Sequence, residues 1–291
     1  MKFEPYVHLN GALVPSSEAR ISVFDRGFLF GDAVYEVIPV YQRRIVYWHA
    51  HLERLNRSLQ SIRMRNPYDA EQWETFIGEL VAHHPESNQS VYIQVTRGTE
   101  GNRHHLPDMD ICPTVVMFSA PLPPFSAENA AKGLSAITTE DIRWQYCHIK
   151  STNLLANVLL LIHAHDEQAE EVILLRNGKI TEGATSNVFI ARNGKLMTPP
   201  LNDSILAGVT RQAVFRSAAK AHIPCIEQEL SQKDLTDADE IMLSSTTRGI
   251  RPVLYLDGRS VGDHKPGPIW QRLMPPFEHE LTQALETGTC E

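Results

Sequence analysis

The stretch HIKSTNLLANVLLL (148–161) places a lysine directly before an apolar segment with helical spacing. A second stretch, NGKITEGATSNVF (177–189), has an Asn-Gly turn and a short strand that ends in Glu182. Lys150 supplies an amine that can form a Schiff base, and Glu182 supplies a carboxylate that can face a protonated ring nitrogen. Because pyridoxal phosphate needs both groups from a protein, the pair favours a site for that cofactor.

Lys150 is predicted to precede a helix over 151–168, with Ser151 or Thr152 as its N-cap. The positive end of the helix dipole would disfavour the ammonium form of the lysine. A lysine must be neutral to attack a carbonyl, so the position suits the chemistry. Taken singly, such a lysine is more often solvated, and Glu182 alone is more often a solvated turn acid. Only the two residues together carry the interpretation.

Three further features offer donors for a phosphate group. The segment ILAGVTR (205–211) places a glycine and a threonine at a predicted helix start, where free N–H groups favour anions. The hydroxyl cluster SSTT (244–247) follows an apolar strand, and Arg54 lies on a predicted helix. Each feature also has a simpler explanation. The helix start could hold ordinary capping residues, the hydroxyl cluster could be a polar loop, and Arg54 could be a solvated arginine, so these features favour a phosphate site only jointly.

Composition narrows the class of protein. The 291 residues are 42% hydrophobic and 21% charged with a formal net charge of −8, which is unlike a basic nucleic-acid surface. The cysteines form no C-x-x-C pair, and no secretory or membrane-spanning segment is evident, so a cytoplasmic protein is expected. The sequence has no G-x-G-x-x-G, P-loop or G-x-S-x-G motif and no histidine spacing suited to a metal. The cysteines are Cys112, Cys147, Cys225 and Cys290.

The pattern of elements predicts an α+β protein with two α/β domains. An N-terminal domain over 1–120 contains a hairpin in 5–23, helices over 49–64 and 70–83, and strands over 90–96 and 113–120. The proline-rich segment 121–129 is predicted to link it to a C-terminal domain over 130–291. That domain is expected to hold helices over 151–168 and 210–222, several strands, and a last helix from Pro275 onward.

The chain closely resembles the class IV, or fold type IV, pyridoxal-phosphate aminotransferases over nearly its whole length. Within that family the segment Val34-Tyr-Glu-Val37 is similar to the form found in D-amino-acid aminotransferases. The segments that carry the resemblance are DRGFLFGDAVYEV (25–37), HLERL (51–55), QVTRGT (94–99), DIRW (141–144), IKSTNLLANVL (149–159), ITEGATSNVF (180–189), ILAGVTR (205–211) and LSSTTRGIRPV (243–253).

The resemblance implies a fold, an activity and a set of residue roles. A smaller N-terminal and a larger C-terminal domain would hold the cofactor between them, in a homodimer. The reaction would be ping-pong transfer of an amino group between D-alanine, D-glutamate or D-aspartate and a 2-oxo acid. Lys150 would be the Schiff-base lysine and Glu182 the partner of the pyridinium. The remaining implied contacts are Arg54, Val209, Thr210, Ser245 and Thr246 for the phosphate, Leu206 for the ring, and Tyr35 and Thr247 for the substrate.

One segment departs from the family pattern. D-specific relatives hold the substrate carboxylate with an Arg-x-His loop, and here His104 matches the histidine whereas Asn102 stands in the arginine position. Arg103 is one place late, and Arg248 or Arg251 could supply the charge. The departure keeps open a branched-chain L-aminotransferase, an (R)-amine transaminase or an aminodeoxychorismate lyase. A non-catalytic binding protein is disfavoured because both Lys150 and Glu182 are present.

Overall fold

The computed structural model describes residues 5–287, which fall into two compact units. The first holds residues 5–124, 149–153 and 284–287, and the second holds 125–148 and 154–283. Both combine helices with a sheet, which confirms the α+β class. The outermost residues of the two predicted domains, 1–4 and 288–291, lie outside the described part of the chain. No helix within 5–287 is long and apolar enough to cross a membrane.

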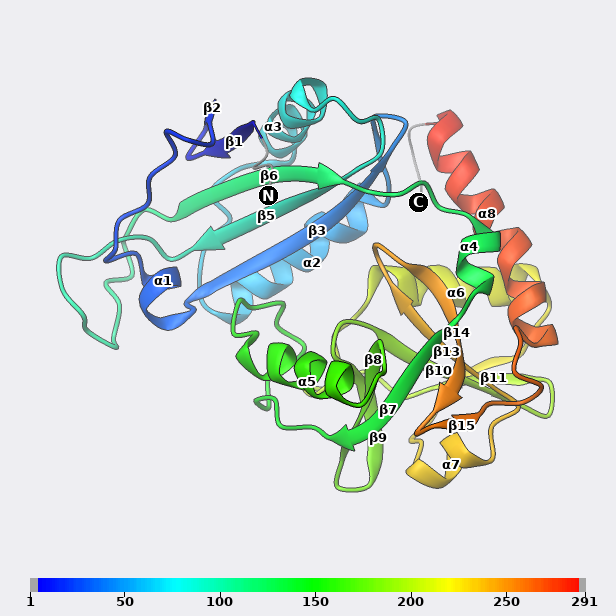
Figure 1. Cartoon of the computed structure of the whole chain (residues 1–291). Coiled ribbons are helices and arrows are strands. Elements are labelled where there is room, and N and C mark those ends of the chain that lie inside the picture. The colour runs from blue at the N-terminus through cyan, green and yellow to red at the C-terminus, as the bar shows by residue number, and fades with distance from the viewer. Residues whose placement is uncertain (1–4, 288–291) are drawn as a thin grey trace. The chain divides into compact units, whose positions relative to one another are not determined.

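The first unit is built on a six-stranded antiparallel sheet with the strand order β2-β1-β6-β5-β3-β4. Its helix α2 runs alongside β3 (Figure 1). The elements are β1 (Tyr6–Leu9), β2 (Ala12–Pro15), α1 (Arg26–Phe30), β3 (Ala33–Tyr41), β4 (Arg44–Ile45), α2 (Trp48–Ser61), α3 (Ala70–His83), β5 (Gln89–Thr96) and β6 (Thr114–Pro121).

Alternation along the strands gives this sheet two different faces. Val34 and Ile38 of β3 lie in one buried cluster with Leu55 of α2 and Trp73 of α3, so both helices cover the same face. On the other face Tyr35 stacks on Tyr92 of β5, with ring centroids 5.6 Å apart. The two-residue period of the strand therefore separates an apolar core from a face that carries tyrosines.

The second unit is built on a mixed nine-stranded sheet. Its main path is β12-β11-β10-β13-β14-β7-β8-β9, and β15 pairs with β14. The elements are α4 (Ala127–Ala131), β7 (Leu134–Glu140), α5 (Leu155–Asp166), β8 (Glu171–Arg176), β9 (Lys179–Gly183), β10 (Asn187–Arg192), β11 (Lys195–Thr198), α6 (Val209–Lys220), β12 (Cys225–Glu227), α7 (Gln232–Thr236), β13 (Glu240–Ser245), β14 (Gly249–Leu256), β15 (Arg259–Ser260) and α8 (Pro268–Thr287).

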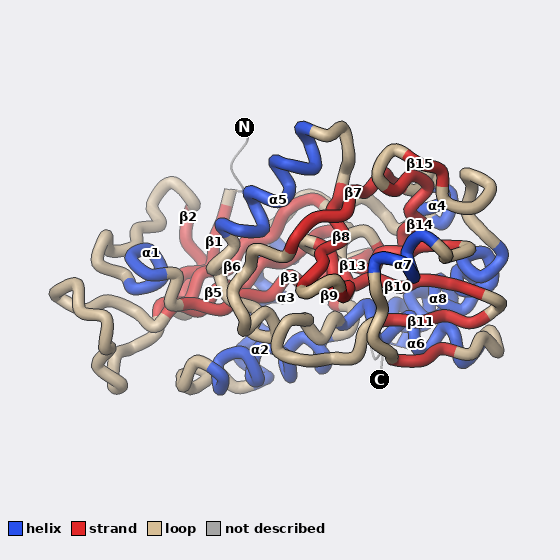
Figure 2. The backbone as a smooth tube through the Cα atoms, turned by 90° about the horizontal axis from the view of Figure 1, so that it is seen from below, coloured by secondary structure: helices blue, strands red, loops and turns tan. Residues whose placement is uncertain are grey.

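Strand β8 shows how this sheet is buried on both faces. Ile173 and Leu175 lie in one apolar cluster, whereas Val172 and Leu174 lie in another with Leu160 of α5. A strand buried on both sides is expected to be apolar without alternation, as this one is. Helix α6 lies beside α8 in Figure 2, and Arg216 Nη2 of α6 lies 2.7 Å from Glu280 Oε1 of α8.

The structure corrects two predicted helix starts. The helix after Lys150 begins at Leu155 with Leu154 as its N-cap, because Thr152 instead donates its hydroxyl to the Gly31 carbonyl. Helix α8 begins at Pro268, ahead of the predicted Pro275. A distant carboxylate sets that start, since both oxygens of Glu240 accept backbone N–H groups of the first turn, at 2.7 and 2.9 Å.

Candidate active site

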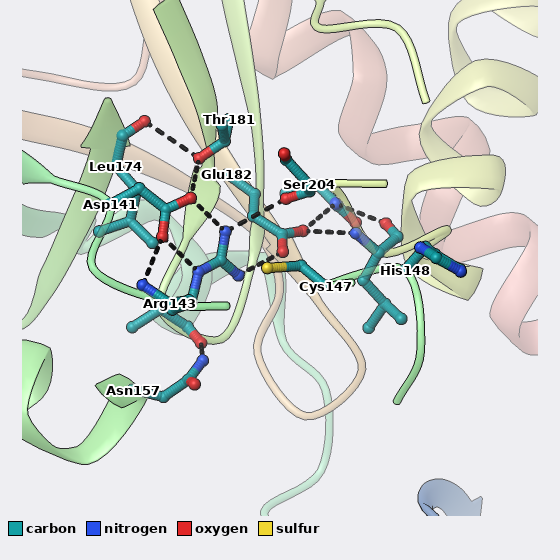
Figure 3. Close-up of polar contacts among 12 residues, drawn as sticks. Asp141, Arg143, Cys147, His148, Asn157, Leu174, Thr181, Glu182 and Ser204 are labelled. Atoms are coloured by element: carbon teal, nitrogen blue, oxygen red, sulfur yellow. Dashed lines mark hydrogen bonds and ion pairs between the residues drawn. The ribbon is translucent and has the colours of Figure 1, made fainter. Parts of the chain in front are cut away.

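Glu182, near the end of β9, is a buried carboxylate with three donors in the second unit (Figure 3). Oε1 accepts a hydrogen bond from Arg143 Nη1 at 2.5 Å. Oε2 accepts from Asn187 Nδ2 at 3.1 Å and from the Leu206 N–H at 3.0 Å. Burial raises the pKa of Glu182 to about 7, against the opposing effect of the Arg143 charge. The carboxylate is therefore held in one orientation, and burial and the Arg143 charge act on its ionisation in opposite directions.

Arg143 is itself held by Asp141. Its Nε and Nη2 each donate to one Asp141 oxygen at 2.9 Å, in a two-pronged ion pair. Arg176 Nη2 lies 3.0 Å from Asp141 Oδ2, and the Thr181 hydroxyl donates to the same oxygen at 3.1 Å. The charge of Arg143 outweighs burial and keeps the pKa of Asp141 below its usual range. The sequence interpretation assigned no role to Arg143, although Asp141-x-Arg143 already formed a charged pair close to Lys150.

Helix α6 begins beside this carboxylate. Gly208 is its N-cap, and no side chain of the described residues caps it. A Cβ on Gly208 would lie 2.0 Å from Asn187 Oδ1, so only glycine lets the helix start approach that amide so closely. Val209 and Thr210 are buried in the first turn, where N–H groups and the helix dipole favour an anion.

The hydroxyl cluster lies at the end of β13. Ser244 pairs in register with Asn187 of β10, which connects the cluster to the donors of Glu182. The Ser244 hydroxyl is buried without a hydrogen-bond partner among the described residues. Ser245 ends the strand, and Thr246 follows it in the turn toward β14; both are half-buried. The cluster thus places hydroxyl groups beside Asn187, the residue whose amide donates to the Glu182 carboxylate.

The other predicted residues of this hairpin have different surroundings. Thr247 and Arg248 are exposed in the turn between β13 and β14. Arg251 lies on β14, where Nη2 donates to the Gly133 carbonyl at 2.5 Å. Burial lowers the pKa of Arg251. Of the two arginines considered as carboxylate donors, Arg248 is the exposed one and Arg251 is tied to backbone.

Lys150 contacts strand β3 and helix α2 of the first unit and does not itself begin a helix. The Tyr35 N–H donates to the Lys150 carbonyl at 2.9 Å, and the Lys150 N–H donates to Ser58 Oγ at 3.2 Å. Lys150 Nζ lies 4.3 Å from the centre of the Tyr35 ring. The structure therefore brings the predicted lysine and the predicted substrate-side tyrosine together. The predicted effect of the helix dipole on Lys150 is wrong, because α5 starts only at Leu155.

Arg54 is fixed by two buried residues that the sequence interpretation missed. Its Nε and Nη2 donate to the two oxygens of Glu36, each at 2.7 Å, and His51 Nδ1 lies 2.8 Å from Glu36 Oε2. Although burial opposes it, the Arg54 charge holds the pKa of Glu36 far below its usual range. Burial lowers the pKa of His51, and the charges of Arg54 and Lys150 act in the same direction. The sequence signal for this buried ion pair was Glu36 itself, an acidic residue at a helix-facing position of an apolar strand.

The loop that carries Asn102, Arg103 and His104 is exposed and tied to α1. The guanidinium carbon of Arg103 lies 5.0 Å from the centre of the Phe30 ring. Buried Arg26 donates to the His104 and His105 carbonyls at 2.6 and 2.9 Å. These contacts fix the backbone of the loop at its middle.

Comparison with known proteins places this architecture in a family. The family model "Amino-transferase class IV" matches residues 33–256. The chain belongs to the class IV aminotransferases. A relative named D-alanine aminotransferase, from Listeria monocytogenes, is 39% identical over 279 residues, covering 96% of each protein.

Solved structures of branched-chain aminotransferases show the same fold. The branched-chain amino acid aminotransferase of Escherichia coli is 26% identical with a TM-score of 0.87, covering 99% of this chain and 97% of that one. The branched-chain enzyme of Thermoproteus uzoniensis, a thermophilic archaeon, was solved with norvaline and has a TM-score of 0.86 at 26% identity, covering 98% and 97%. The fold type IV prediction is thereby confirmed.

Enzymes of this class depend on pyridoxal phosphate, and the residues of this aminotransferase fit that group. When bound, the cofactor supplies an aldehyde for a lysine and a ring that withdraws electrons. Glu182 offers a fixed buried carboxylate, the start of α6 lacks a side-chain cap, and the buried Ser244 hydroxyl lacks a partner among residues 5–287. Within the same range, no group of three or more His, Cys, Asp or Glu side chains is placed to hold a metal ion.

Proposed function

We propose that this aminotransferase moves an amino group between a D-amino acid, such as D-alanine, D-glutamate or D-aspartate, and a 2-oxo acid in a ping-pong reaction. The observation that carries the proposal is the 39% identity, over 96% of both proteins, to an enzyme named D-alanine aminotransferase. The Val34-Tyr35-Glu36-Val37 segment supports it, because the Tyr35 ring lies next to the Lys150 amine.

Lys150 and Glu182 are the residues proposed to carry the chemistry. In the resting enzyme the Lys150 amine would bind the cofactor aldehyde. Once the substrate amine has displaced it, the freed Lys150 amine would take the proton from the substrate α-carbon and so act as the catalytic base. The Glu182 carboxylate pairs with the ring nitrogen and keeps that nitrogen protonated. Its three donors prevent it from rotating away.

The phosphate and the ring have their own proposed partners. Val209 and Thr210 offer the N–H groups of an uncapped helix start. Arg54 offers a guanidinium that Glu36 keeps in one orientation. Leu206 is proposed to pack on the ring, since its N–H is already fixed on Glu182. The hydroxyl groups of Ser245 and Thr246 complete the proposed phosphate site.

The substrate carboxylate is proposed to bind to side chains of exposed loops. Arg103 and His104 lie on the loop that α1 anchors, and Thr247 and Arg248 lie on the β13–β14 turn. In the relatives' pattern the arginine stands at the position of Asn102. Here Arg103, at the next position, is proposed to supply the positive charge instead. The resemblance also supports a homodimer. The three free cysteines among the described residues, Cys112, Cys147 and Cys225, support a cytoplasmic location.

A half-reaction screen tests this function. The purified protein, saturated with pyridoxal phosphate, is mixed in turn with D-alanine, L-leucine and (R)-1-phenylethylamine while the visible absorbance of the bound cofactor is followed. D-alanine is expected to bleach that absorbance and to yield pyruvate, whereas L-leucine leaves it unchanged. Bleaching by L-leucine and not by D-alanine would replace the proposal with a branched-chain activity. Bleaching by (R)-1-phenylethylamine alone would indicate an amine transaminase.

The Lys150→Ala variant is the matched control for that screen. It is expected to lower transamination by at least about 10²-fold while its circular dichroism remains that of the parent protein, because a positioned proton-transfer group contributes at least that factor. Borohydride reduction of the parent protein is expected to leave the pyridoxyl group on Lys150. An adduct on another lysine would contradict the assignment.

A further inference from the structure

The guanidinium of Arg143 bridges two carboxylates in the second unit. Nη1 contacts Glu182 Oε1 at 2.5 Å, while Nε and Nη2 contact the two Asp141 oxygens at 2.9 Å. Nη2 also donates to the Ser204 carbonyl at 3.2 Å. Figure 3 shows these contacts. The Arg143 side chain is only 6% exposed, so they are shielded from water.

The charges around Glu182 are balanced by this bridge. Asp141 and Glu182 supply the negative charges, and Arg143 and Arg176 supply the positive charges. Arg176 Nη2 lies 3.0 Å from Asp141 Oδ2. The buried thiol of Cys147 is the other titratable group facing the set, and burial raises its pKa. Uncharged Asn187, Leu206 and Thr181 supply the remaining donors. Without Arg143, the two buried carboxylates would share Arg176 as their one cation, and Arg176 contacts Asp141.

We propose that Arg143 is a positioning residue that keeps the Glu182 carboxylate ionised and aimed, so that Glu182 can retain a protonated cofactor nitrogen. Asp141 acts through Arg143 by fixing the plane of the guanidinium and by taking part of its charge. The proposal rests on the role of Glu182 under the proposed function.

The two neighbours of Glu182 act on its ionisation in opposite directions. A cation 2.5 Å from a buried carboxylate favours the charged form, so removing Arg143 favours the protonated acid. The negative charge of Asp141 disfavours the charged form of Glu182, so removing Asp141 favours the carboxylate. A variant that merely loosens the fold would not produce shifts of opposite sign at these two positions.

The first measurement needs no cofactor. The full-length chain, freed of cofactor and labelled with ¹³C at glutamate carboxyl carbons, is titrated by NMR, and the Glu182 signal is identified by its loss in Glu182→Gln. Arg143→Met is expected to move the midpoint of that signal upward by at least one pH unit. Asp141→Asn is expected to move it downward, and Arg143→Lys to restore most of the parent value. Arg192→Met removes an arginine from another ion pair of the same unit, with Asp234 at 3.4 Å, and is expected to leave the midpoint unchanged.

The second measurement follows binding of pyridoxal phosphate by the same variants. Arg143→Met is expected to bind at least tenfold more weakly at pH 7, with recovery as the pH rises and Glu182 ionises. A role limited to holding the segment in place would instead give a loss that does not depend on pH. If Arg143→Met does not fold, the opposite shift in Asp141→Asn and the value for Arg143→Lys still decide the matter.

The outcomes separate this inference from the proposed function. An unchanged Glu182 midpoint in Arg143→Met, or shifts of the same sign in Arg143→Met and Asp141→Asn, would overturn the role of Arg143. Glu182→Gln that binds and uses the cofactor like the parent protein would instead remove the role of Glu182 itself. The titration of the cofactor-free protein tests the effect of Arg143 on Glu182 whether or not Glu182 acts on the cofactor.

Discussion

Gly208 is the residue on which the spacing between α6 and Glu182 depends. A Cβ there would meet Asn187 Oδ1 at 2.0 Å, and Asn187 Nδ2 is committed to Glu182 and to the Leu206 carbonyl. The Gly208→Ala substitution is expected to displace that amide and loosen Glu182, because the amide cannot move without losing hydrogen bonds worth about 1 kcal/mol each. We expect affinity for pyridoxal phosphate to fall by about fivefold to thirtyfold, measured by titration of the cofactor-free protein.

The matched control for Gly208 is Gly78, in the interior of α3. Apart from its chain neighbours and the backbone of its own helix, no atom of residues 5–287 lies within 4 Å of a Cβ built there. Gly78→Ala is expected to stabilise the protein by about 1 kcal/mol, because alanine is the better helix former, and to leave cofactor affinity unchanged. Parent-like cofactor affinity in Gly208→Ala would show that Asn187 is not needed to hold Glu182.

Single residues of the site were predictable to the extent that their chemistry is local. Lys150 and Glu182 could be proposed from the sequence because each has a suitable functional group and a recognisable position along one element. Arg143 and Glu36 were missed because their contacts are with residues distant in sequence, 39 residues away for Arg143–Glu182 and 18 for Arg54–Glu36. The local signals were a charged residue in an apolar strand for Glu36 and a charged pair with Asp141 for Arg143, but neither signal says which distant partner the side chain meets.

At the scale of elements, the short helix α1 anchors the loop with Arg103 and His104. Arg26 is buried and contacts Asp32 and Glu100 at 3.0 Å as well as two loop carbonyls. Arg26→Met would leave those carbonyls without their donor, so the loop is expected to open. Trypsin cleavage after Arg103 in the native protein should then be at least tenfold faster, as read by mass spectrometry, and the KM for D-alanine should rise more than kcat falls.

The control for Arg26 is Arg20→Met. Arg20 is exposed and donates only to the nearby Ser17 and Ala19 carbonyls among the contacts of the described residues. Cleavage after Arg103 is expected to keep its parent rate in that variant. An equal rate in Arg26→Met would show that the loop does not depend on α1.

Elements were predictable where their signals are local and were misplaced where tertiary contacts decide. Helix α3 spans the predicted residues, because Asp69 and Gln72 form a capping box at its start. The helix after Lys150 starts later than predicted because residues 150–152 pair with β3 and α1 instead. The sequence of residues 150–152 contains no local signal that predicts this pairing with β3 and α1.

At the scale of the whole molecule, the α+β class followed from the periodicity of the apolar residues, but the strand order did not. In the first sheet β1 pairs with β6, so that Leu9 lies opposite Val116. In the second, β7 pairs in parallel with both β8 and β14. Alternation of apolar residues says which face of a strand is buried, and it carries no information on which strand lies beside it.

The stability of the molecule is expected to fall on acidification because of a buried histidine. His8 is fully buried, its ring lies 4.1 Å from that of Phe76 between centroids, and neither ring nitrogen has a hydrogen-bond partner among the described residues. Burial lowers its pKa from 6.5, although Glu79 acts in the opposite direction. Since the unfolded chain binds a proton that the folded chain refuses, the stability due to neutral His8 is present above pH 6.5 and is lost as the pH falls through its lowered pKa.

The His8→Phe variant isolates this effect. It keeps a ring on Phe76 and removes the titration, so the unfolding midpoint temperature should fall less steeply between pH 6.5 and 5 than in the parent protein. Glu182 acts in the opposite sense, because its raised pKa of about 7 lets the folded state take up a proton first, but it is common to both proteins and cancels. His165→Phe, at a side chain that is 91% exposed, is expected to retain the parent slope. Equal slopes in His8→Phe and the parent would assign the acid sensitivity to other groups, with buried His51 the first to be tested.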